Sequence, residues 1–222
     1  MNRLLPLFFI LIISCFWACE RELDETPFEL GLEYQPLSIG EFWIYSVDET
    51  QYLGENDSEE DSYFYKDLIR STYLDEGNEL VYIVERSKSY DQENWSIEKD
   101  YTLKVRNNTL IRTINNQPVV VLVFPPKSGT LWDGNSYRES DEDDFEIIEL
   151  DNAAGSLRVL QSMEDDLVTY RDNRYEVFQK GVGLVEEFKE VLTYCSRNDC
   201  LGDQLIDSGS KVHLILTEHG IL

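Results

Sequence analysis

Short runs of alternating apolar and polar residues follow one another along most of the chain, and turn residues separate them. The clearest run places Tyr101, Leu103 and Val105 on one face, with polar residues between them. A period of two is typical of a β-strand with one buried face. Similar runs predict strands at 42–52, 62–74, 79–89, 109–113, 119–124, 145–150, 157–162, 174–179 and 212–217. The pattern therefore predicts an all-β domain.

Three stretches add detail to this prediction. In 42–52, Trp43, Tyr45 and Val47 share one face, which indicates a core-facing strand. The run 119–124 is apolar on both faces, so we expect a central strand there. We interpret 56–61 as an acidic loop and 127–144 as irregular.

The stretch 183–194 fits two structures. Its apolar residues recur at helical spacing, and by pattern alone we would assign a helix. The same stretch also tolerates a strand, with Leu184, Phe188, Leu192 and Tyr194 on one face.

The N-terminus carries the pattern of an export signal. Arg3 precedes an uncharged run of fifteen residues, Leu4–Ala18. As a helix this run would reach about 22 Å, short of a hydrocarbon core of about 30 Å. Its length therefore favours a signal peptide over a membrane span.

The signal ends at Cys19, where charged residues begin. This junction resembles the lipobox of bacterial lipoproteins, whose cysteine is acylated, although Phe16 and Trp17 depart from its pattern. Cys15 is the alternative anchor, but it would leave both aromatic residues exposed beside the lipid. We expect a signal at 1–18, a lipidated Cys19 opening an acidic tether at 19–35, and one β domain at 36–222. An ordinary cleaved signal remains a further alternative.

Further stretches resemble uncharacterised outer-membrane lipoproteins of Bacteroidetes: PLSIGEFWIY at 36–45, FPPKSGTLW at 124–132, KGVGLV at 180–185 and CSRNDCLG at 195–202. The resemblance implies a curled antiparallel sheet, a half-barrel or barrel-like fold similar to lipoprotein carriers or lipocalins. It also implies that 184–194 is a strand, and we adopt that assignment. It implies no activity. A lipid anchor, with palmitate among its acyl groups, would place the chain at the outer membrane, facing either side.

The net charge of −25 affects which partners are expected. Nucleic-acid binding depends on lysine and arginine neutralising phosphates, so an acidic surface makes it unfavourable. We expect the membrane as a partner through the N-terminal lipid, and no nucleic acid.

Cys195 and Cys200 form a local pair. In an exported protein such a pair favours a disulfide. A zinc site needs more ligands than lie nearby, and a redox pair usually has two intervening residues. We therefore expect a disulfide that stabilises a turn.

Two Gly-x-x-Trp pieces contain Trp43 and Trp132. These residues, with Tyr45, could form the walls of a ligand cleft. We favour the alternative that they belong to the core, because tryptophan buries a large apolar area.

The acidic residues allow one candidate ion. Asp133, Asn135, Asp141 and Asp143 place oxygen atoms in a predicted loop, as calcium prefers. The spacing does not match an EF-hand, so a solvated acidic loop is favoured, and we expect neither metal nor cofactor.

No catalytic residues are expected. His213 and His219 would lie about 20 Å apart on a strand, and no nucleophile elbow, zinc-protease motif or phosphate loop is present. The sequence thus favours a non-enzymatic envelope lipoprotein that binds an apolar ligand, a glycan or an envelope protein. The alternatives are an assembly subunit of an envelope complex and, less favoured, a hydrolase.

Overall fold

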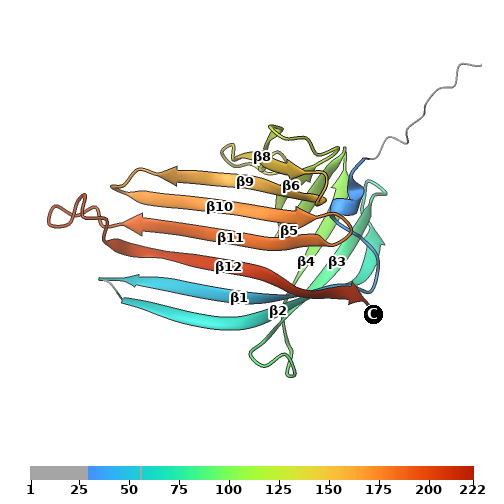
Figure 1. Cartoon of the computed structure of the whole chain (residues 1–222), viewed down its shortest axis with the longest axis horizontal. Coiled ribbons are helices and arrows are strands. Elements are labelled where there is room, and N and C mark those ends of the chain that lie inside the picture. Colours follow the sequence, from blue (N-terminus) through green and yellow to red (C-terminus); the bar gives the residue numbers. More distant parts are fainter. Residues whose placement is uncertain (1–29, 56) are drawn as a thin grey trace, which may run out of the picture.

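The computed structural model describes residues 30–55 and 57–222. The expected signal peptide and both candidate anchor cysteines lie outside these residues. Figure 1 shows a molecule built almost wholly of strands. The all-β class expected from the alternating pattern is therefore confirmed.

Twelve strands form one antiparallel sheet. The first six are β1 (Glu41–Gly54), β2 (Asp57–Leu74), β3 (Leu80–Ser89), β4 (Ser96–Arg106), β5 (Thr109–Ile114) and β6 (Gln117–Val123). The other six are β7 (Leu131–Asp133), β8 (Asp144–Asp151), β9 (Ser156–Asp165), β10 (Tyr170–Gln179), β11 (Gly183–Tyr194) and β12 (Ile206–Ile221).

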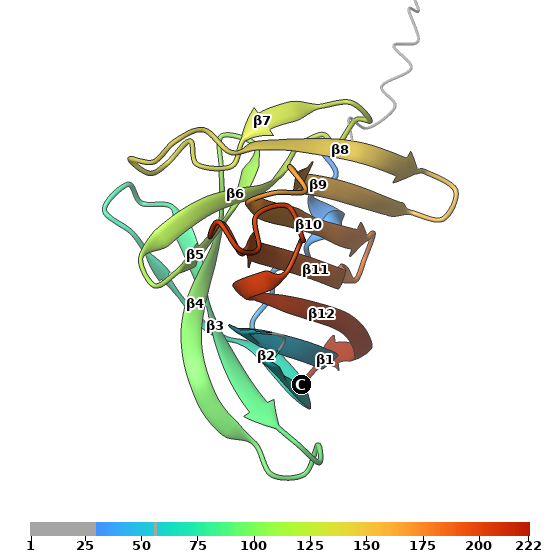
Figure 2. The ribbon, with the colours of Figure 1, turned by 90° about the vertical axis from the view of Figure 1, so that its left-hand side faces the viewer.

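The strand order is β6-β5-β4-β3-β2-β1-β12-β11-β10-β9-β8-β7. Each neighbouring pair is consecutive in the chain except β1 and β12, which pair along most of their length. Two meanders therefore meet at the β1–β12 pair. Figure 2 shows the sheet curling, so that β3 and β4 face β10–β12 across the interior.

The two edges of the sheet, β6 and β7, approach each other at one point. The backbone N–H of Val120 donates to the carbonyl of Gly134 at 2.9 Å, and the indole of Trp132 donates to the carbonyl of Val120 at 2.8 Å. A side chain at position 134 would collide with the ring of Phe145, because an added Cβ would lie 2.7 Å from it. Glycine thus lets the chain after β7 pass directly over the ring of Phe145 beside this seam.

This closure corrects one expectation. The run 119–124 was predicted to be a central strand because it is apolar on both faces, yet β6 is an edge strand. Val120 and Leu122 are buried even so, because the sheet curls and the segment after β7 covers this edge. The peptide bond between Phe124 and Pro125 is cis where the chain leaves β6.

The residues expected to face the core do so. Trp43, Tyr45 and Val47 are each at most 2% exposed, and Leu103 and Tyr101 are also buried. The stretch 183–194 is strand β11, as adopted, and not the helix that its pattern alone favours. Pairing with β10 and β12 on both sides outweighs the helical spacing of its apolar residues.

Two other segments differ from expectation. Residues 57–61, predicted as an acidic loop, form the start of β2 and pair with β1, as Asp61 does with Glu49. Because the side chains at 57–60 are exposed to solvent, this part of the strand can carry several carboxylates without burying their charge. The stretch 127–144, predicted as irregular, contains the short strand β7.

The described chain begins with a segment that contacts the barrel. The 3-10 helix η2 spans Leu32–Tyr34, and Tyr34 is only 5% exposed. The carbonyl of Glu33 accepts a hydrogen bond from the N–H of Gly181 at 2.7 Å. Part of the expected tether is therefore packed against the domain.

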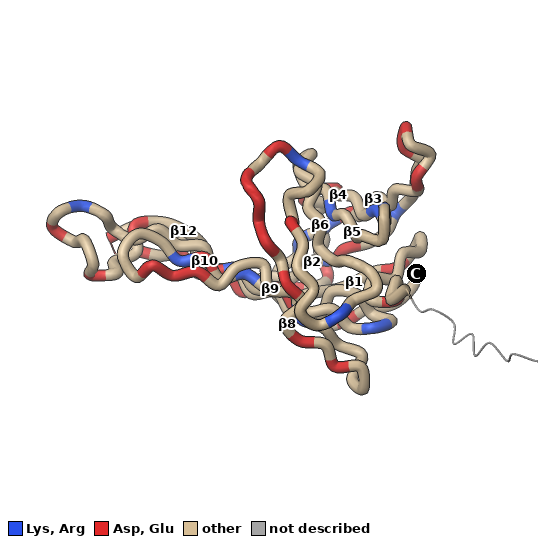
Figure 3. Tube along the Cα trace, turned by 90° about the horizontal axis from the view of Figure 1, so that it is seen from above, with Lys and Arg blue, Asp and Glu red and all other residues tan. Residues whose placement is uncertain are grey.

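Acidic positions outnumber basic ones along the trace in Figure 3, in line with 44 Asp and Glu against 19 Lys and Arg. Within residues 30–55 and 57–222, no helix has the length and apolar character needed to cross a bilayer.

Candidate functional site

Charged side chains lie inside the curled sheet, where an apolar core would be expected. The first group joins β2, β3 and β4. Arg86 donates to both carboxylate oxygens of Asp67, at 2.7 and 2.6 Å, and Tyr101 donates to the same carboxylate at 2.9 Å. Burial alone would lower the pKa of Arg86, but the charge and hydrogen bonds of Asp67 outweigh it and raise that pKa well above its usual value.

A second group crosses the interior. Arg112 on β5 donates to both oxygens of Glu176 on β10, at 2.9 and 3.0 Å. Gln161 on β9 donates to the same carboxylate at 2.9 Å. Glu176 is 1% exposed, and these partners supply the hydrogen bonds that water cannot give to a buried carboxylate. Burial would lower the pKa of Arg112, but Glu176 raises it overall.

A third group lies on β11. Lys189 forms an ion pair with Glu187, which is also buried. Burial would raise the pKa of Glu187, but the positive charges of Lys189, Arg112 and Arg86 lower it below its usual value. Glu187 is therefore held ionised between the other two groups.

The fourth group connects β10 to the loop before β8. Arg174 donates to both oxygens of Asp143 at 3.1 Å and to Asp172 at 2.7 Å. Burial would lower the pKa of Arg174, but these two carboxylates raise it overall. These contacts tie the loop between β7 and β8 to β10, two strands along the sheet from β8.

A pocket of about 180 Å³ opens among these groups. Its polar lining consists of Arg112, Gln117, Arg138, Asp143, Gln161, Arg174, Glu176 and Lys189. Its apolar lining consists of Ile114, Val119, Val121 and Phe145. We call this the mouth pocket. Strands from both meanders and the loop after β7 contribute to it.

The volume of the mouth pocket limits what it can hold. Pockets for drug-sized ligands measure about 300–1,000 Å³. A volume of about 180 Å³ therefore suits a small molecule or one end of a larger one. The fixed ion pairs can orient a polar group, and the apolar wall can receive a short hydrocarbon part.

The three aromatic residues considered as walls of a ligand cleft, Trp43, Tyr45 and Trp132, lie outside the mouth pocket. Trp43 donates to the carbonyl of Val182 at 2.5 Å, and Tyr45 donates to that of Leu184 at 3.2 Å. Both are buried in the core, and Trp132 lies at the β6–β7 seam. None of the three lines the mouth pocket, which has Phe145 as its one aromatic residue and differs from an aromatic-lined cleft.

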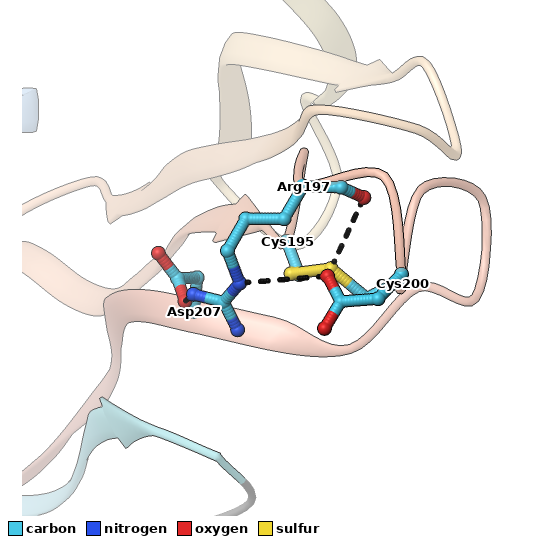
Figure 4. The surroundings of a disulfide bond; sticks show 5 residues. Cys195, Arg197, Cys200 and Asp207 are labelled. Carbon is cyan, nitrogen blue, oxygen red and sulfur yellow. Dashed lines mark hydrogen bonds and ion pairs between the residues drawn. A yellow bond between two sulfur atoms is a disulfide. The ribbon is translucent and has the colours of Figure 1, made fainter.

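The disulfide between Cys195 and Cys200 is present in the loop between β11 and β12, with a Cα–Cα distance of 5.9 Å. Arg197, inside the loop, pairs with Asp207 on β12 at 3.3 Å (Figure 4). The bridge thus stabilises a turn, as expected, and neither cysteine lines the mouth pocket.

The candidate calcium ligands take part in hydrogen bonds of their own loop. One oxygen of Asp133 accepts the N–H groups of Asn135 and Asp143. The amide of Asn135 donates to the carbonyl of Asp141 at 2.6 Å, and Asp143 binds Arg174. In the part of the chain that the structure describes, no three His, Cys, Asp or Glu residues group as a metal site would require.

Both histidines are on β12, as expected, but only His219 is exposed. His213 is half-buried on Phe188 and hydrogen-bonded to Glu186 at 3.0 Å. Neither lines the mouth pocket.

Of the residues that line the mouth pocket, sequence reasoning named only Asp143, and as a candidate calcium ligand. A signal existed, because Arg112 lies between Leu110 and Ile114 on a core-facing side of β5. A charged residue at such a position needs a partner. The partner, Glu176, is 64 residues away in the chain and could not be identified from the pattern.

Comparison with known proteins does not assign a family. No family model matches the chain, and no curated protein matches it. Among solved structures, the chain is similar to a Bacteroides fragilis protein predicted to be exported and described as having a YmcC-like fold. The two sequences are 8% identical, the TM-score is 0.42, and the alignment covers 84% of this chain and 98% of that one. The chain is also similar to a LolA superfamily protein from Nitrosomonas europaea, at 12% identity and a TM-score of 0.24, covering 88% and 91%. These similarities are too low to transfer a function.

Proposed function

We propose that this chain is an exported, lipid-anchored envelope protein whose β domain binds a ligand without catalysing a reaction. The observation that supports binding is the mouth pocket, where fixed charges and an apolar wall face the same space. Ligand sites commonly combine an apolar lining with a few oriented polar groups, and they occur at the mouths of curled sheets.

The arrangement of charges favours binding over catalysis. The arginines of the pocket are donors that do not release protons under ordinary conditions. Both carboxylate oxygens of the buried Glu176 accept hydrogen bonds from Arg112, and one also accepts from Gln161, so this carboxylate is engaged in orienting side chains of the protein. The chemistry that these groups support is recognition.

The lipid anchor is tested by the two candidate cysteines. We expect Cys19→Ala to abolish acylation and release the protein from membranes, whereas Cys15→Ala leaves it acylated. Mass spectrometry of the N-terminal peptide and membrane fractionation would measure this. An unmodified N-terminus in the wild-type protein would contradict the anchor.

Ligand binding is tested by filling the pocket. Gln117 lines the mouth and is itself exposed, so Gln117→Trp can occupy the opening without disturbing the core. The control is Glu60→Trp, which is also exposed but lies on β2 outside the pocket.

The measurement is native mass spectrometry of full-length protein extracted from its membranes in mild detergent. We expect wild type and Glu60→Trp to carry the same bound small molecule and Gln117→Trp to lack it. A wild-type protein with no bound molecule, or one equally retained by Gln117→Trp, would overturn the proposal.

A further inference from the structure

We infer that the mouth pocket binds the oxyanion of a small carboxylate or phosphate ester, and that Arg138 is the residue that contacts it. This inference rests on the proposed ligand-binding function and adds the chemical class of the ligand.

Arg138 differs from the other cations of the pocket. Arg112, Arg174 and Lys189 each form an ion pair with a carboxylate. Among the residues that the structure describes, Arg138 forms no ion pair, and its Nε is buried without a hydrogen-bond acceptor. Nearly all buried donors in proteins are hydrogen-bonded, so this N–H indicates an acceptor supplied from outside the chain.

The backbone holds Arg138 in place. Its N–H donates to the carbonyl of Asn135 at 2.8 Å, and its carbonyl accepts the N–H of Ser140 at 3.1 Å. The same loop is tied to β10 by the contact of Asp143 with Arg174. The backbone that carries Arg138 is thus fixed beside the pocket, and the planar donors of a guanidinium match carboxylate and phosphate oxygens.

The paired cations define the rest of the site. Arg112, Arg174 and Lys189 line the same pocket as Arg138, and two carboxylates, Glu176 and Asp143, line it as partners of Arg112 and Arg174. The lining thus holds four cationic side chains against two carboxylates, and an entering oxyanion meets an excess of positive charge. Charge-assisted hydrogen bonds of this kind are about twice as strong as neutral ones.

The apolar wall restricts the rest of the ligand. Ile114, Val119, Val121 and Phe145 line the pocket beside the cations. A ligand with an oxyanion at one end and a short aliphatic or aromatic part at the other would place the oxyanion on the cations and the apolar part on this wall. The volume of about 180 Å³ excludes a whole phospholipid but can hold its phosphate end.

The test uses the full-length protein purified in detergent and three variants. Arg138→Gln removes the proposed contact, and Arg138→Lys keeps a charge without the planar donors. Arg158→Gln is the matched control, because Arg158 also has a buried Nε without a hydrogen bond but lies outside the pocket, near Glu149 and on the ring of Tyr175.

Isothermal titration would use butyrate, butyl phosphate and inorganic phosphate, with butyramide as the neutral isostere of butyrate. We expect wild type and Arg158→Gln to bind at least one oxyanion and not butyramide. Arg138→Gln should weaken that binding at least tenfold, which corresponds to about 1.4 kcal/mol, and Arg138→Lys should recover part of it. Circular dichroism should show all variants folded.

The outcomes separate the two proposals. Equal binding of butyrate and butyramide, or oxyanion binding that Arg138→Gln leaves unchanged, would overturn the anion site while leaving a ligand pocket. No binding of any oxyanion also overturns the anion site, and the native mass spectrometry described above then decides the proposed function by itself. Stronger binding of butyl phosphate than of inorganic phosphate would support the role of the apolar wall, and the reverse would contradict it.

Discussion

The indole Nε1 of Trp132 donates a hydrogen bond of 2.8 Å to the backbone carbonyl of Val120. Trp132 belongs to β7 and Val120 to β6, which are the two edges of the twelve-stranded sheet. With the adjacent backbone hydrogen bond from Val120 to Gly134, this contact nearly closes the barrel. The mouth pocket depends on it, because residues of β6 and of the loop after β7 share its lining.

We therefore expect Trp132→Phe to destabilise the protein by about 1–3 kcal/mol, since a partly buried carbonyl loses its donor. The amide hydrogen of Val120 should also exchange faster, because the seam opens more often. Urea denaturation and hydrogen exchange would measure these effects. Trp95→Phe is the control, as Trp95 also donates to a carbonyl, that of Gln92, but in an exposed hairpin. Equal losses for both variants would contradict a special role of the seam.

The interior pair of Arg112 and Glu176 should be costly to break. Arg112→Met leaves the buried Glu176 without its bidentate partner, and loss of one partner from such pairs costs about 3–5 kcal/mol. The double variant Arg112→Met with Glu176→Leu should recover most of that loss, because no unpaired charge remains. Chemical denaturation would measure both.

The exposed pair of Arg70 and Glu85 provides the comparison. Arg70→Met should cost less than about 1 kcal/mol, since water screens an exposed pair. A loss at Arg112 no greater than that at Arg70 would show that the interior pair is not effectively buried.

Glu187 should contribute to the pH dependence of stability. Its folded pKa is lowered by Lys189, Arg112 and Arg86 despite burial. The unfolded chain therefore takes up this proton at a higher pH than the folded chain, and stability declines as the pH falls below about 4.5. Glu187→Gln should flatten this decline relative to Glu93→Gln, an exposed control in the β3–β4 hairpin. Denaturation midpoints measured from pH 6 down to about pH 3 would test it, and identical slopes would refute it.

The disulfide should have a modest effect. Closing the short ring between Cys195 and Cys200 limits the unfolded chain by about 2 kcal/mol at most. Cys195→Ala with Cys200→Ala should lose no more than this in urea denaturation, and reductant should lower the stability of wild type but not of the double variant. Because neither cysteine lines the mouth pocket, ligand binding should be unaffected. Loss of binding in the double variant would indicate a coupling that the fold does not suggest.

The sequence by itself determined the all-β class, most strand positions and the disulfide, because these depend on neighbouring residues. Tyr101, Leu103 and Val105 show their period of two within five positions, and Cys195 and Cys200 are close in the chain. The β11 segment is the exception, since its own spacing favours a helix and only pairing on both sides makes it a strand.

The tertiary structure alone decided where the edges of the sheet meet and which charges share the interior. Val120 belongs to an apolar run that resembles a central strand, yet curling makes it part of a seam. Arg112 binds Glu176, which is 64 residues later in the chain. A contact between residues so far apart in the sequence produces no periodic pattern from which it could be predicted. The mouth pocket exists because the sheet brings these distant charged positions onto one concave face.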